Sequence, residues 1–431
     1  MRLFGTSGIR RLWGRDLLDL AVQVGLAVGE TYGTVVVGTD TRTSGDSLKQ
    51  ALISGLLAAG SHCEDAGIVP TPTLALAARK FDAGVMITAS HNPPQYNGIK
   101  LLNPDGSAFS RVQQAQIEEI VPNGSFRFAR WDEVKQSCLH PGAVERHLER
   151  ILEEFPGGLN LKIALDCGCG AASVITPRLL EKLGCEVTAI NCTASGFFPR
   201  GIEPIEANLS DLMVLTRESG ADVGIAHDGD ADRMMAVDDR GRFVPGDKLL
   251  SIFAQAMDAA DIVTTIDASM AVEETGYDVR WTRIGDNYVS EELKNGGEFG
   301  GEPSGSWVFP GLSLCPDGIY AAARIVAIAS QGKLSRLVDA VPGYPLLRGS
   351  IDSEGVSLSN LEPRLMNLGL VSVSRIDGLK FYFNDGWLLV RASGTEPKIR
   401  LTAEAKTERR AHQLYDEGLK ALRDCPKEEV S

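Results

Sequence analysis

Helix-periodic stretches alternate with short β-rich runs along most of this chain of 431 residues. Near the N-terminus, Leu17, Ala21, Val24 and Val28 are spaced for one face of a helix, and the apolar run 35–37 follows them. Further strands are predicted at 85–87, 163–166, 223–226 and 262–266. Because strands that alternate with helices are typical of α/β domains, the sequence predicts an α/β fold.

The length predicts three or four domains, because a domain usually has about 100 to 200 residues. A polar stretch at 122–136 indicates a first boundary. After Pro342 the pattern changes to consecutive strands followed by a helix. We therefore expect three α/β domains and then a smaller α+β domain, with the bounds 1–135, 136–241, 242–342 and 343–431.

Composition and charge exclude several classes of protein. A formal charge of −14 argues against the broad basic face that general nucleic-acid binding needs. The chain lacks both a run of roughly 18 apolar residues and an N-terminal apolar segment like that of a signal peptide. We therefore expect no nucleic-acid partner, no membrane partner and a cytoplasmic location. The eight cysteines are scattered, which predicts buried thiols rather than disulfides or a CxxC zinc site.

Three carboxylates follow the predicted strand 223–226, in the segment 228–233 with the sequence DGDADR. Carboxylates this close repel one another unless a cation neutralises them, and ligands that are all oxygen favour Mg²⁺ over zinc or copper. An EF-hand calcium loop would need glycine and glutamate where this chain has Arg233 and Asp239. A magnesium site is therefore predicted, with a solvated acidic turn as the alternative.

Ser90 follows the predicted strand 85–87, in the segment 88–93 with the sequence TASHNP. Ligands of parallel α/β sheets bind beyond the carboxyl ends of the strands. A serine can store a phosphoryl group when a metal and positively charged donors stabilise the charge in transit. Ser90 is therefore a candidate nucleophile, although serines in such turns also serve as capping hydroxyls. The neighbouring His91 either stabilises the turn or contacts the ligand.

Two further segments carry groups that suit a sugar phosphate. Residues 391–400, RASGTEPKIR, combine hydroxyls, a glycine and cations after a predicted strand. Backbone amides and hydroxyls of such a turn can surround a phosphate, while arginine adds charge-assisted hydrogen bonds. Residues 301–305, GEPSG, place Glu302 and Ser304 between glycines, where they can bind vicinal sugar hydroxyls. For both segments an ordinary turn is the alternative interpretation.

Together with residues 4–10, FGTSGIR, these segments resemble in the same order the motifs of the α-D-phosphohexomutase family. That family includes phosphoglucomutase, phosphomannomutase and phosphoglucosamine mutase, and the resemblance spans nearly the whole chain. It implies a fold of three related α/β/α domains with mixed sheets and a smaller C-terminal α+β domain around a central cleft. The fourth domain would swing to close over the substrate.

The resemblance also implies a reaction and a role for each motif residue. A phosphoserine would donate its group to a hexose phosphate, and the resulting hexose 1,6-bisphosphate, which also acts as activator, would turn around and return its other phosphate. The residues expected at the reacting centre are Ser90, Arg10, His91, Lys100 and Arg233, with one Mg²⁺ ion between Ser90, Asp228, Asp230 and Asp232. Those expected to bind substrate are Glu302, Ser304, Arg391, Ser393, Gly394, Thr395 and Arg400.

One position departs from the family pattern. Many relatives have histidine directly after their Glu-x-Ser-Gly segment, where this chain has Ser306. The general base is therefore left open between Lys100 and His91. The opening FGTSGIR and the SGTEP loop are more similar to the phosphoglucosamine mutase branch than to the typical bacterial phosphomannomutase. This similarity favours conversion of glucosamine 6-phosphate to glucosamine 1-phosphate.

Three alternatives to this function stay open. The first is a phosphomannomutase/phosphoglucomutase of relaxed specificity. The second is a metal-dependent phosphatase that forms phosphoserine, although a hydrolase has no need to hold a bisphosphate while it reorients. The third is a non-catalytic sugar-phosphate sensor, against which the intact Ser90 and aspartates argue. The partner expected in every case is a small-molecule sugar phosphate, and the oligomeric state is left open.

Overall fold

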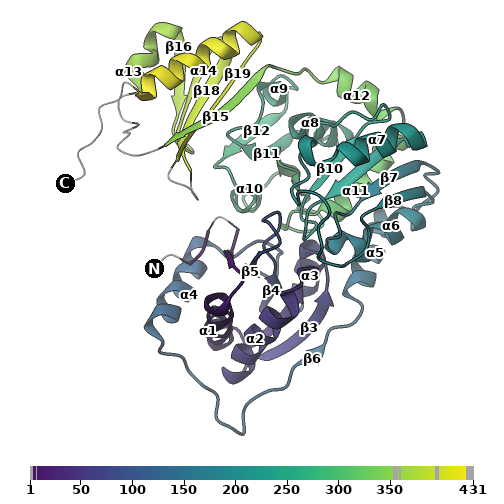
Figure 1. Cartoon of the computed structure of the whole chain (residues 1–431), viewed down its shortest axis with the longest axis vertical. Coiled ribbons are helices and arrows are strands. Elements are labelled where there is room, and N and C mark those ends of the chain that lie inside the picture. The colour runs from purple at the N-terminus through teal and green to yellow at the C-terminus, as the bar shows by residue number, and fades with distance from the viewer. Residues whose placement is uncertain (1–2, 6, 353–357, 359–360, 394–397, 424–431) are drawn as a thin grey trace.

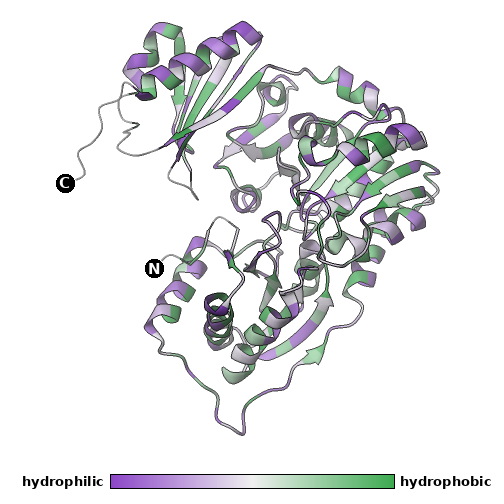
Figure 2. Cartoon of the chain, in the orientation of Figure 1, coloured by the Kyte–Doolittle hydropathy of each residue, from purple (hydrophilic) through white to green (hydrophobic). Residues whose placement is uncertain are grey.

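The computed structural model describes residues 3–5, 7–352, 358, 361–393 and 398–423. Those residues form four sheets that follow one another along the chain, and helices flank them (Figure 1). Hydrophobic residues follow the strands and the inner faces of the helices, whereas the outer helix faces are largely hydrophilic (Figure 2). Within these ranges no helix combines the length and the apolarity needed to cross a membrane.

The first sheet is mixed and has the strand order β1-β5-β4-β2-β3-β6. Its strands are β1 (Ile9–Leu12), β2 (Thr34–Thr39), β3 (His62–Ile68), β4 (Ala83–Ile87), β5 (Tyr96–Leu102) and β6 (Cys138–Leu139). Strands β4, β2, β3 and β6 run parallel, whereas β5 and β1 are antiparallel to their neighbours.

Apolar side chains on both faces of this sheet are covered by helices. One face packs against α1 (Arg15–Thr31), α2 (Gly45–Ala58) and α4 (Arg111–Asn123), and the other against α3 (Thr71–Ala78) and the start of α5 (Ala143–Glu154). Helices α1 and α2 meet at glycines, since a Cβ atom on Gly25 would lie 2.2 Å from the carbonyl oxygen of Leu52. The close approach of the two helices therefore depends on residues without side chains.

The second and third sheets repeat one strand pattern. The second contains β7 (Lys162–Asp166), β8 (Glu186–Ile190), β9 (Val223–His227) and β10 (Met234–Val237), in the order β10-β9-β7-β8. The third contains β11 (Asp261–Thr265), β12 (Asp278–Thr282), β13 (Phe299–Glu302) and β14 (Ser306–Val308), in the order β12-β11-β13-β14. In each, three parallel strands are followed by an antiparallel one, as also in β2 to β5.

The second and third sheets share one continuous hydrophobic core. It contains Leu165 of β7, Phe253 in the helix that follows β10, and Trp307 of β14. The remaining helices of this part are α6 (Thr176–Lys182), α7 (Ser210–Ser219), α8 (Gly246–Ala256), α9 (Met270–Glu273), α10 (Asp286–Leu293), α11 (Gly318–Ser330) and α12 (Leu334–Ala340). This part of the molecule therefore packs as one body.

The C-terminal sheet is wholly antiparallel, in the order β15-β19-β18-β17-β16. Its elements are β15 (Leu346–Asp352), α13 (Leu361–Leu365), β16 (Leu370–Ser374), β17 (Leu379–Phe383), β18 (Gly386–Ala392), β19 (Lys398–Ala405) and α14 (Glu408–Arg423). It contacts the third sheet through a small cluster of Ile266, Trp387 and Leu389. The buried Lys380 adds a hydrogen bond from its Nζ to the carbonyl oxygen of Ile266, at 2.7 Å.

The structure confirms the predicted fold class and differs from the sequence-based expectations at the edge of the first sheet. Strands predicted at 85–87, 163–166, 223–226 and 262–266 lie in β4, β7, β9 and β11 or at their ends. Strand β6 lies beyond the polar stretch 122–136, yet it pairs with β3 in the first sheet. The expectation of buried cysteine thiols is wrong for Cys138, which is exposed because β6 is a two-residue edge strand.

Candidate functional site

Three loops with predicted functions occupy the same position in the three α/β sheets. Each joins the third parallel strand of its sheet to the antiparallel strand that follows: β4 to β5, β9 to β10, and β13 to β14. The first loop carries Ser90, the second residues 228–233 and the third Ser304. Backbone amide Met234 N donates to Gly305 O at 2.9 Å, so the second and third loops are directly bonded.

Ser90 meets the aspartate loop directly, although 138 positions separate it from Asp228. Its Oγ donates to Asp228 Oδ2 at 2.8 Å and lies 3.3 Å from His91 Nδ1. The backbone at Ser90 is left-handed, with φ at 50°, and its N–H donates to Thr88 Oγ1 at 2.8 Å. Non-glycine residues rarely adopt this backbone conformation, and those that do cluster at functional sites. The hydroxyl is therefore held in a fixed direction toward the carboxylates.

Asp228, Asp230 and Asp232 are all buried, and one oxygen of each lies within 4.8 Å of the others. Burial, together with Asp232 and Asp230, raises the pKa of Asp228 well above its ordinary value. Lys100 Nζ lies 2.7 Å from Asp230 Oδ2 and 2.6 Å from Asp232 Oδ2. The second oxygens, Asp230 Oδ1 and Asp232 Oδ1, are buried and accept no hydrogen bond from the described part of the chain. Such unpaired buried oxygens fit a hard divalent cation such as Mg²⁺.

Cations predicted near the reacting centre surround these carboxylates. Lys100 comes from β5, and Arg10 from β1 donates through Nη1 to Asn92 Oδ1 at 2.7 Å. Arg233 donates through Nη1 to Glu203 Oε1 at 2.8 Å. Burial, with Arg233 and Arg10 next, lowers the pKa of His91 to about 2, so its imidazole is neutral at physiological pH.

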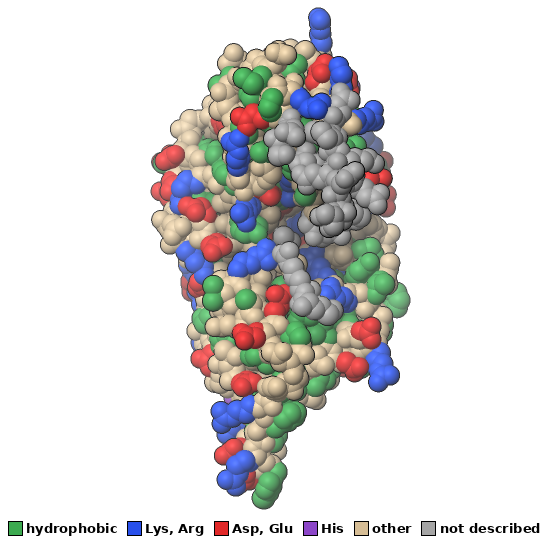
Figure 3. Space-filling model, turned by 90° about the vertical axis from the view of Figure 1, so that its left-hand side faces the viewer, with side chains coloured by type: hydrophobic (Ala, Val, Ile, Leu, Met, Phe, Trp, Pro, Cys, Tyr) green, Lys and Arg blue, Asp and Glu red, His purple; other side chains and the backbone are tan. Residues whose placement is uncertain are grey.

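Four of the seven residues expected to bind substrate line one cavity of about 1070 Å³. Its lining includes Glu302, Ser304, Arg391 and Arg400. Arg391 and Arg400 are directly opposite each other in the β18–β19 register, and Arg391 Nη1 also pairs with Asp377 Oδ2 at 3.1 Å. Lys and Arg side chains also border the hollow across the middle of the face shown in Figure 3.

The residues expected to bind substrate have different surroundings, and two of them lie outside the described part of the chain. Burial raises the pKa of Glu302 to about 7. Ser304 Oγ is buried and makes no hydrogen bond to the described ranges. Ser393 follows β18 directly, whereas Gly394 and Thr395 lie outside the described residues. Ser306, which stands where many relatives have histidine, is buried at the start of β14 and forms a backbone bridge with Arg233.

Sequence reasoning missed Arg42, which holds the serine loop from behind. Its side chain is almost wholly buried and donates to four backbone carbonyl oxygens of that loop, at 2.6–2.8 Å: Ser90 O, Asn92 O, Pro93 O and Tyr96 O. Asp40 orients the guanidinium through Nε at 3.1 Å and also accepts from Thr88 Oγ1 at 2.6 Å. A signal was present, because both residues lie within three positions of the end of β2, and strand ends are where α/β sheets carry their sites.

A second missed residue, Thr71, joins the first unit to the aspartate loop. Its backbone N–H donates to Asp230 O at 2.9 Å, and its Oγ1 donates to Asp230 Oδ2 at 2.5 Å. Thr71 begins α3 after the pair Val69-Pro70, which reads as an ordinary helix start. Nothing in its local sequence indicates the partner, which lies 159 positions away.

Sequence models of known families give the class of the protein first. Four of them match in succession: phosphoglucomutase/phosphomannomutase alpha/beta/alpha domain I at residues 1–128, domain II at 145–241, domain III at 245–344, and the C-terminal domain at 355–421. This succession defines a four-domain α/β protein of the sugar-phosphate mutase class.

Individual relatives match over almost the full length. A protein of Methanococcoides burtonii named probable phosphoglucosamine mutase is 46% identical, over 94% of this chain and 96% of its own. The phosphoglucosamine mutase of Methanococcus aeolicus is 40% identical, over 98% of this chain and 99% of its own. A phosphoglucomutase/phosphomannomutase family protein of Burkholderia thailandensis has a crystal structure that matches with a TM-score of 0.87 at 28% identity, over 98% of this chain and 97% of its own. The chain therefore belongs to the phosphoglucomutase/phosphomannomutase family.

The contacts of Arg42 predict that this residue positions the serine loop. Arg42→Lys keeps the charge but cannot donate to four carbonyls in a fixed plane. We expect kcat for phosphoryl transfer to fall at least about 10-fold because Ser90 is displaced, while KM, set in the separate cavity, changes little. Steady-state kinetics measure both constants, and Arg15→Lys on exposed α1 is the matched control. An unchanged kcat in Arg42→Lys would show that the serine loop keeps its conformation without the hydrogen bonds from Arg42.

The unpaired oxygens predict that the aspartate loop needs a divalent cation. Asp232→Asn keeps the side-chain shape but removes a charged ligand, so we expect the Mg²⁺ concentration for half-maximal activity to rise at least about 10-fold. The measurement is a Mg²⁺ titration of activity after chelation. Asp211→Asn, the same change on the exposed start of α7, should titrate like the unaltered protein. Identical titrations for all three proteins would contradict a metal role for Asp232.

Proposed function

We propose that this protein is a phosphoglucosamine mutase, which interconverts glucosamine 6-phosphate and glucosamine 1-phosphate through phosphorylated Ser90 and a bound 1,6-bisphosphate. The observation that carries the proposal is the 2.8 Å contact between Ser90 Oγ and Asp228, beside Asp230 and Asp232. Full-length relatives with 40–46% identity carry the name phosphoglucosamine mutase, with or without the word probable, and this supports the choice of sugar.

Transfer at Ser90 requires that negative charge be stabilised while the phosphoryl group is between two oxygens. The bond between phosphorus and Ser90 Oγ breaks as a new bond forms to the sugar hydroxyl, whose proton passes to a base. Asp228, Asp230, Asp232 and the phosphoserine would hold Mg²⁺, which neutralises charge on the transferred group. Arg10, Lys100 and Arg233 surround the same point and add fixed positive charge.

Of the two candidate bases, we favour His91. Asp230 and Asp232 raise the pKa of Lys100 despite its burial, so its ammonium keeps its proton and serves as an electrostatic group. His91 is neutral and already lies beside the Ser90 hydroxyl. An imidazole with a pKa of about 2 is a weak base, so His91 can accept the proton of the incoming sugar hydroxyl efficiently only when the negative charge of the phosphoserine raises that pKa toward the working pH.

The large cavity would hold the rest of the substrate. We assign the sugar hydroxyls to Glu302 and Ser304, and the non-transferred phosphate to Arg391 and Arg400 with Ser393, Gly394 and Thr395. A phosphate near Arg391 and Arg400 would accept charge-assisted hydrogen bonds from two guanidinium groups that line the same cavity. Each of the proposed domains, 1–135, 136–241, 242–342 and 343–431, would then supply one loop to a shared cleft. Water excluded from that cleft cannot hydrolyse the phosphoserine.

The reaction product separates the proposal from its alternatives. With glucosamine 6-phosphate, Mg²⁺ and a trace of glucosamine 1,6-bisphosphate, we expect glucosamine 1-phosphate, detected by phosphorus NMR. Release of inorganic phosphate would indicate a phosphatase, and no reaction would indicate a sensor. Faster turnover of mannose 6-phosphate or glucose 6-phosphate would favour a phosphomannomutase/phosphoglucomutase of relaxed specificity.

In Ser90→Ala we expect turnover to vanish. The mass of one phosphate should also be lost from the intact protein, whereas the control Ser125→Ala, at an exposed site, keeps both the turnover and the phosphate.

The raised pKa of Glu302 predicts a pH dependence. Below pH 7 this carboxyl is protonated in the free enzyme and loses part of its capacity to accept hydrogen bonds from sugar hydroxyls. We therefore expect the ratio of kcat/KM between the unaltered protein and Glu302→Gln to be constant well above pH 7, and to fall with decreasing pH below it toward a value near one, because the protonated carboxyl resembles the glutamine amide. Taking the ratio cancels the titration of the substrate phosphate. A ratio that does not vary between pH 5 and pH 8 would contradict the role of Glu302.

A further inference from the structure

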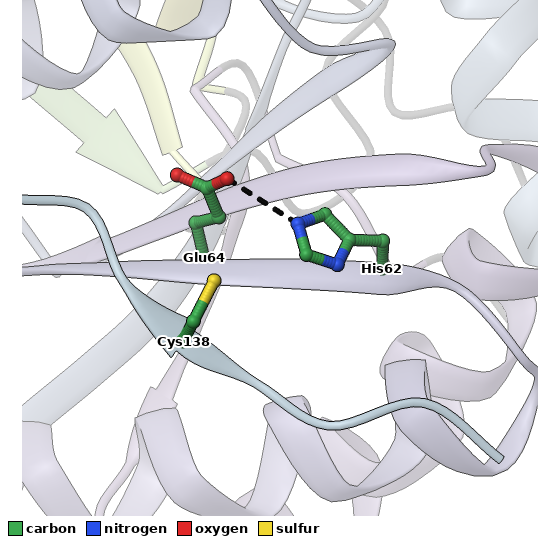
Figure 4. A group of neighbouring side chains, drawn as sticks. All are labelled: His62, Glu64 and Cys138. Atoms are coloured by element: carbon green, nitrogen blue, oxygen red, sulfur yellow. Dashed lines mark hydrogen bonds and ion pairs between the residues drawn. The ribbon is translucent and has the colours of Figure 1, made fainter.

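A second group of metal-binding side chains lies at the edge of the first sheet, on strands β3 and β6. His62 and Glu64 are two positions apart on β3, so their side chains lie on the same face of the sheet. Cys138 of β6 is paired with Glu64 in the strand register. One ligand atom from each of the three lies within 4.8 Å of the others. Figure 4 shows the Cys138 sulfur directed toward Glu64, with the His62 ring on the same side.

The donor atoms of this cluster differ in kind from those of the aspartate loop. Imidazole nitrogen, carboxylate oxygen and thiolate sulfur together suit Zn²⁺ and similar transition ions, whereas Mg²⁺ binds only oxygen well. Ligand atoms around zinc are about 3.5 Å apart, given bond lengths of about 2.0–2.3 Å. His62 Nε2 and Glu64 Oε1 are already 3.3 Å apart, and the exposed Cys138 has room to approach them.

His140 supplies the support that metal-ligating carboxylates usually have. Its Nδ1 lies 2.7 Å from Glu64 Oε2, while the other oxygen of Glu64 faces His62. Its backbone N–H donates to Asp65 O at 2.8 Å, and its ring packs against the edge of Phe81 at a centroid distance of 5.4 Å. A histidine hydrogen-bonded to a ligand carboxylate fixes the direction of that ligand. The cluster therefore has an ordered partner behind Glu64 and an open side toward solvent.

The position of the cluster indicates what a bound ion would do. β6 has only two residues and connects the long segment after α4 to α5, which leads into the second sheet. Two strand residues give few ladder hydrogen bonds, so side-chain contacts between β6 and β3 contribute much of what holds this connection in place. We propose that His62, Glu64 and Cys138 form a zinc site, separate from the aspartate loop, that ties β6 to β3 and so fixes the link between the first two α/β units.

Cobalt spectroscopy of the full chain tests this site without relying on the mutase reaction. Co²⁺ replaces Zn²⁺ in such sites, and a thiolate ligand gives it an intense near-ultraviolet charge-transfer band that an all-oxygen site cannot produce. Chelator-treated protein in excess Mg²⁺ should take up about one equivalent of Co²⁺ with this band, at micromolar concentration, and Zn²⁺ should abolish it. Absence of the band, or saturation only at millimolar Co²⁺, would overturn the proposal.

Variants assign the band to these residues. Cys138→Ser should lose it, whereas Cys192→Ser, a change at the partly exposed cysteine of the second unit, should keep it. His62→Ala should weaken Co²⁺ binding at least about 10-fold. Asp232→Asn should leave the band unchanged, so failure here and failure of the proposed function are distinguishable. Zn²⁺ should raise the Tm of the unaltered protein but not that of Cys138→Ser. A band retained in Cys138→Ser would place the ion elsewhere.

Discussion

The burial of three carboxylates on one short loop is the constraint on which the arrangement of this molecule depends. Asp228, Asp230 and Asp232 would repel one another without compensating charge, because burial removes the water that otherwise screens them. That compensation comes from the first α/β unit: Lys100 of β5 reaches two of the carboxylates, and Ser90 and Thr71 each donate a hydrogen bond. The contacts that compensate the charge of this loop therefore hold the first two α/β units together at the place where the chemistry is proposed.

The same strand pattern occurs in three units, and it places the loops with the proposed site residues at equivalent positions. In each unit the functional loop leaves a buried parallel strand and returns at once as an antiparallel strand of the same sheet. Both ends of the loop are thus anchored in a core, and only a few residues are free to move. Sites supported by rigid elements keep their geometry better than sites on long loops. Arg42 adds a third anchor for the Ser90 loop, by donating to four of its backbone carbonyl oxygens.

The sequence predicted what depends on neighbours in the chain and missed what depends on neighbours in space. Apolar periodicity located α1, β4, β7, β9 and β11, and the order of motifs identified Ser90 and the aspartates as belonging together. The grip of Arg42 on the serine loop and the bond from Thr71 to Asp230 link segments 48 and 159 positions apart. The cluster of His62, Glu64 and Cys138 depends on the register of a two-residue strand. No local pattern encodes these contacts, because they arise only when the strands of a sheet pair and the units pack together.

The units proposed to bind the two ends of the substrate are joined to the rest of the molecule in different ways. The second and third sheets share one hydrophobic core, so the aspartate loop and the segment with Glu302 and Ser304 keep a fixed relation. The C-terminal sheet, which carries Arg391 and Arg400, contacts the third sheet through a much smaller cluster around Trp387. A mutase that uses one reacting centre for both ends of a sugar needs this division. The centre must stay rigid for transfer, whereas the wall that holds the other phosphate must yield while the bisphosphate turns. If Arg391 and Arg400 hold the phosphate as we propose, the small interface of the C-terminal sheet would let that wall move without disturbing Ser90.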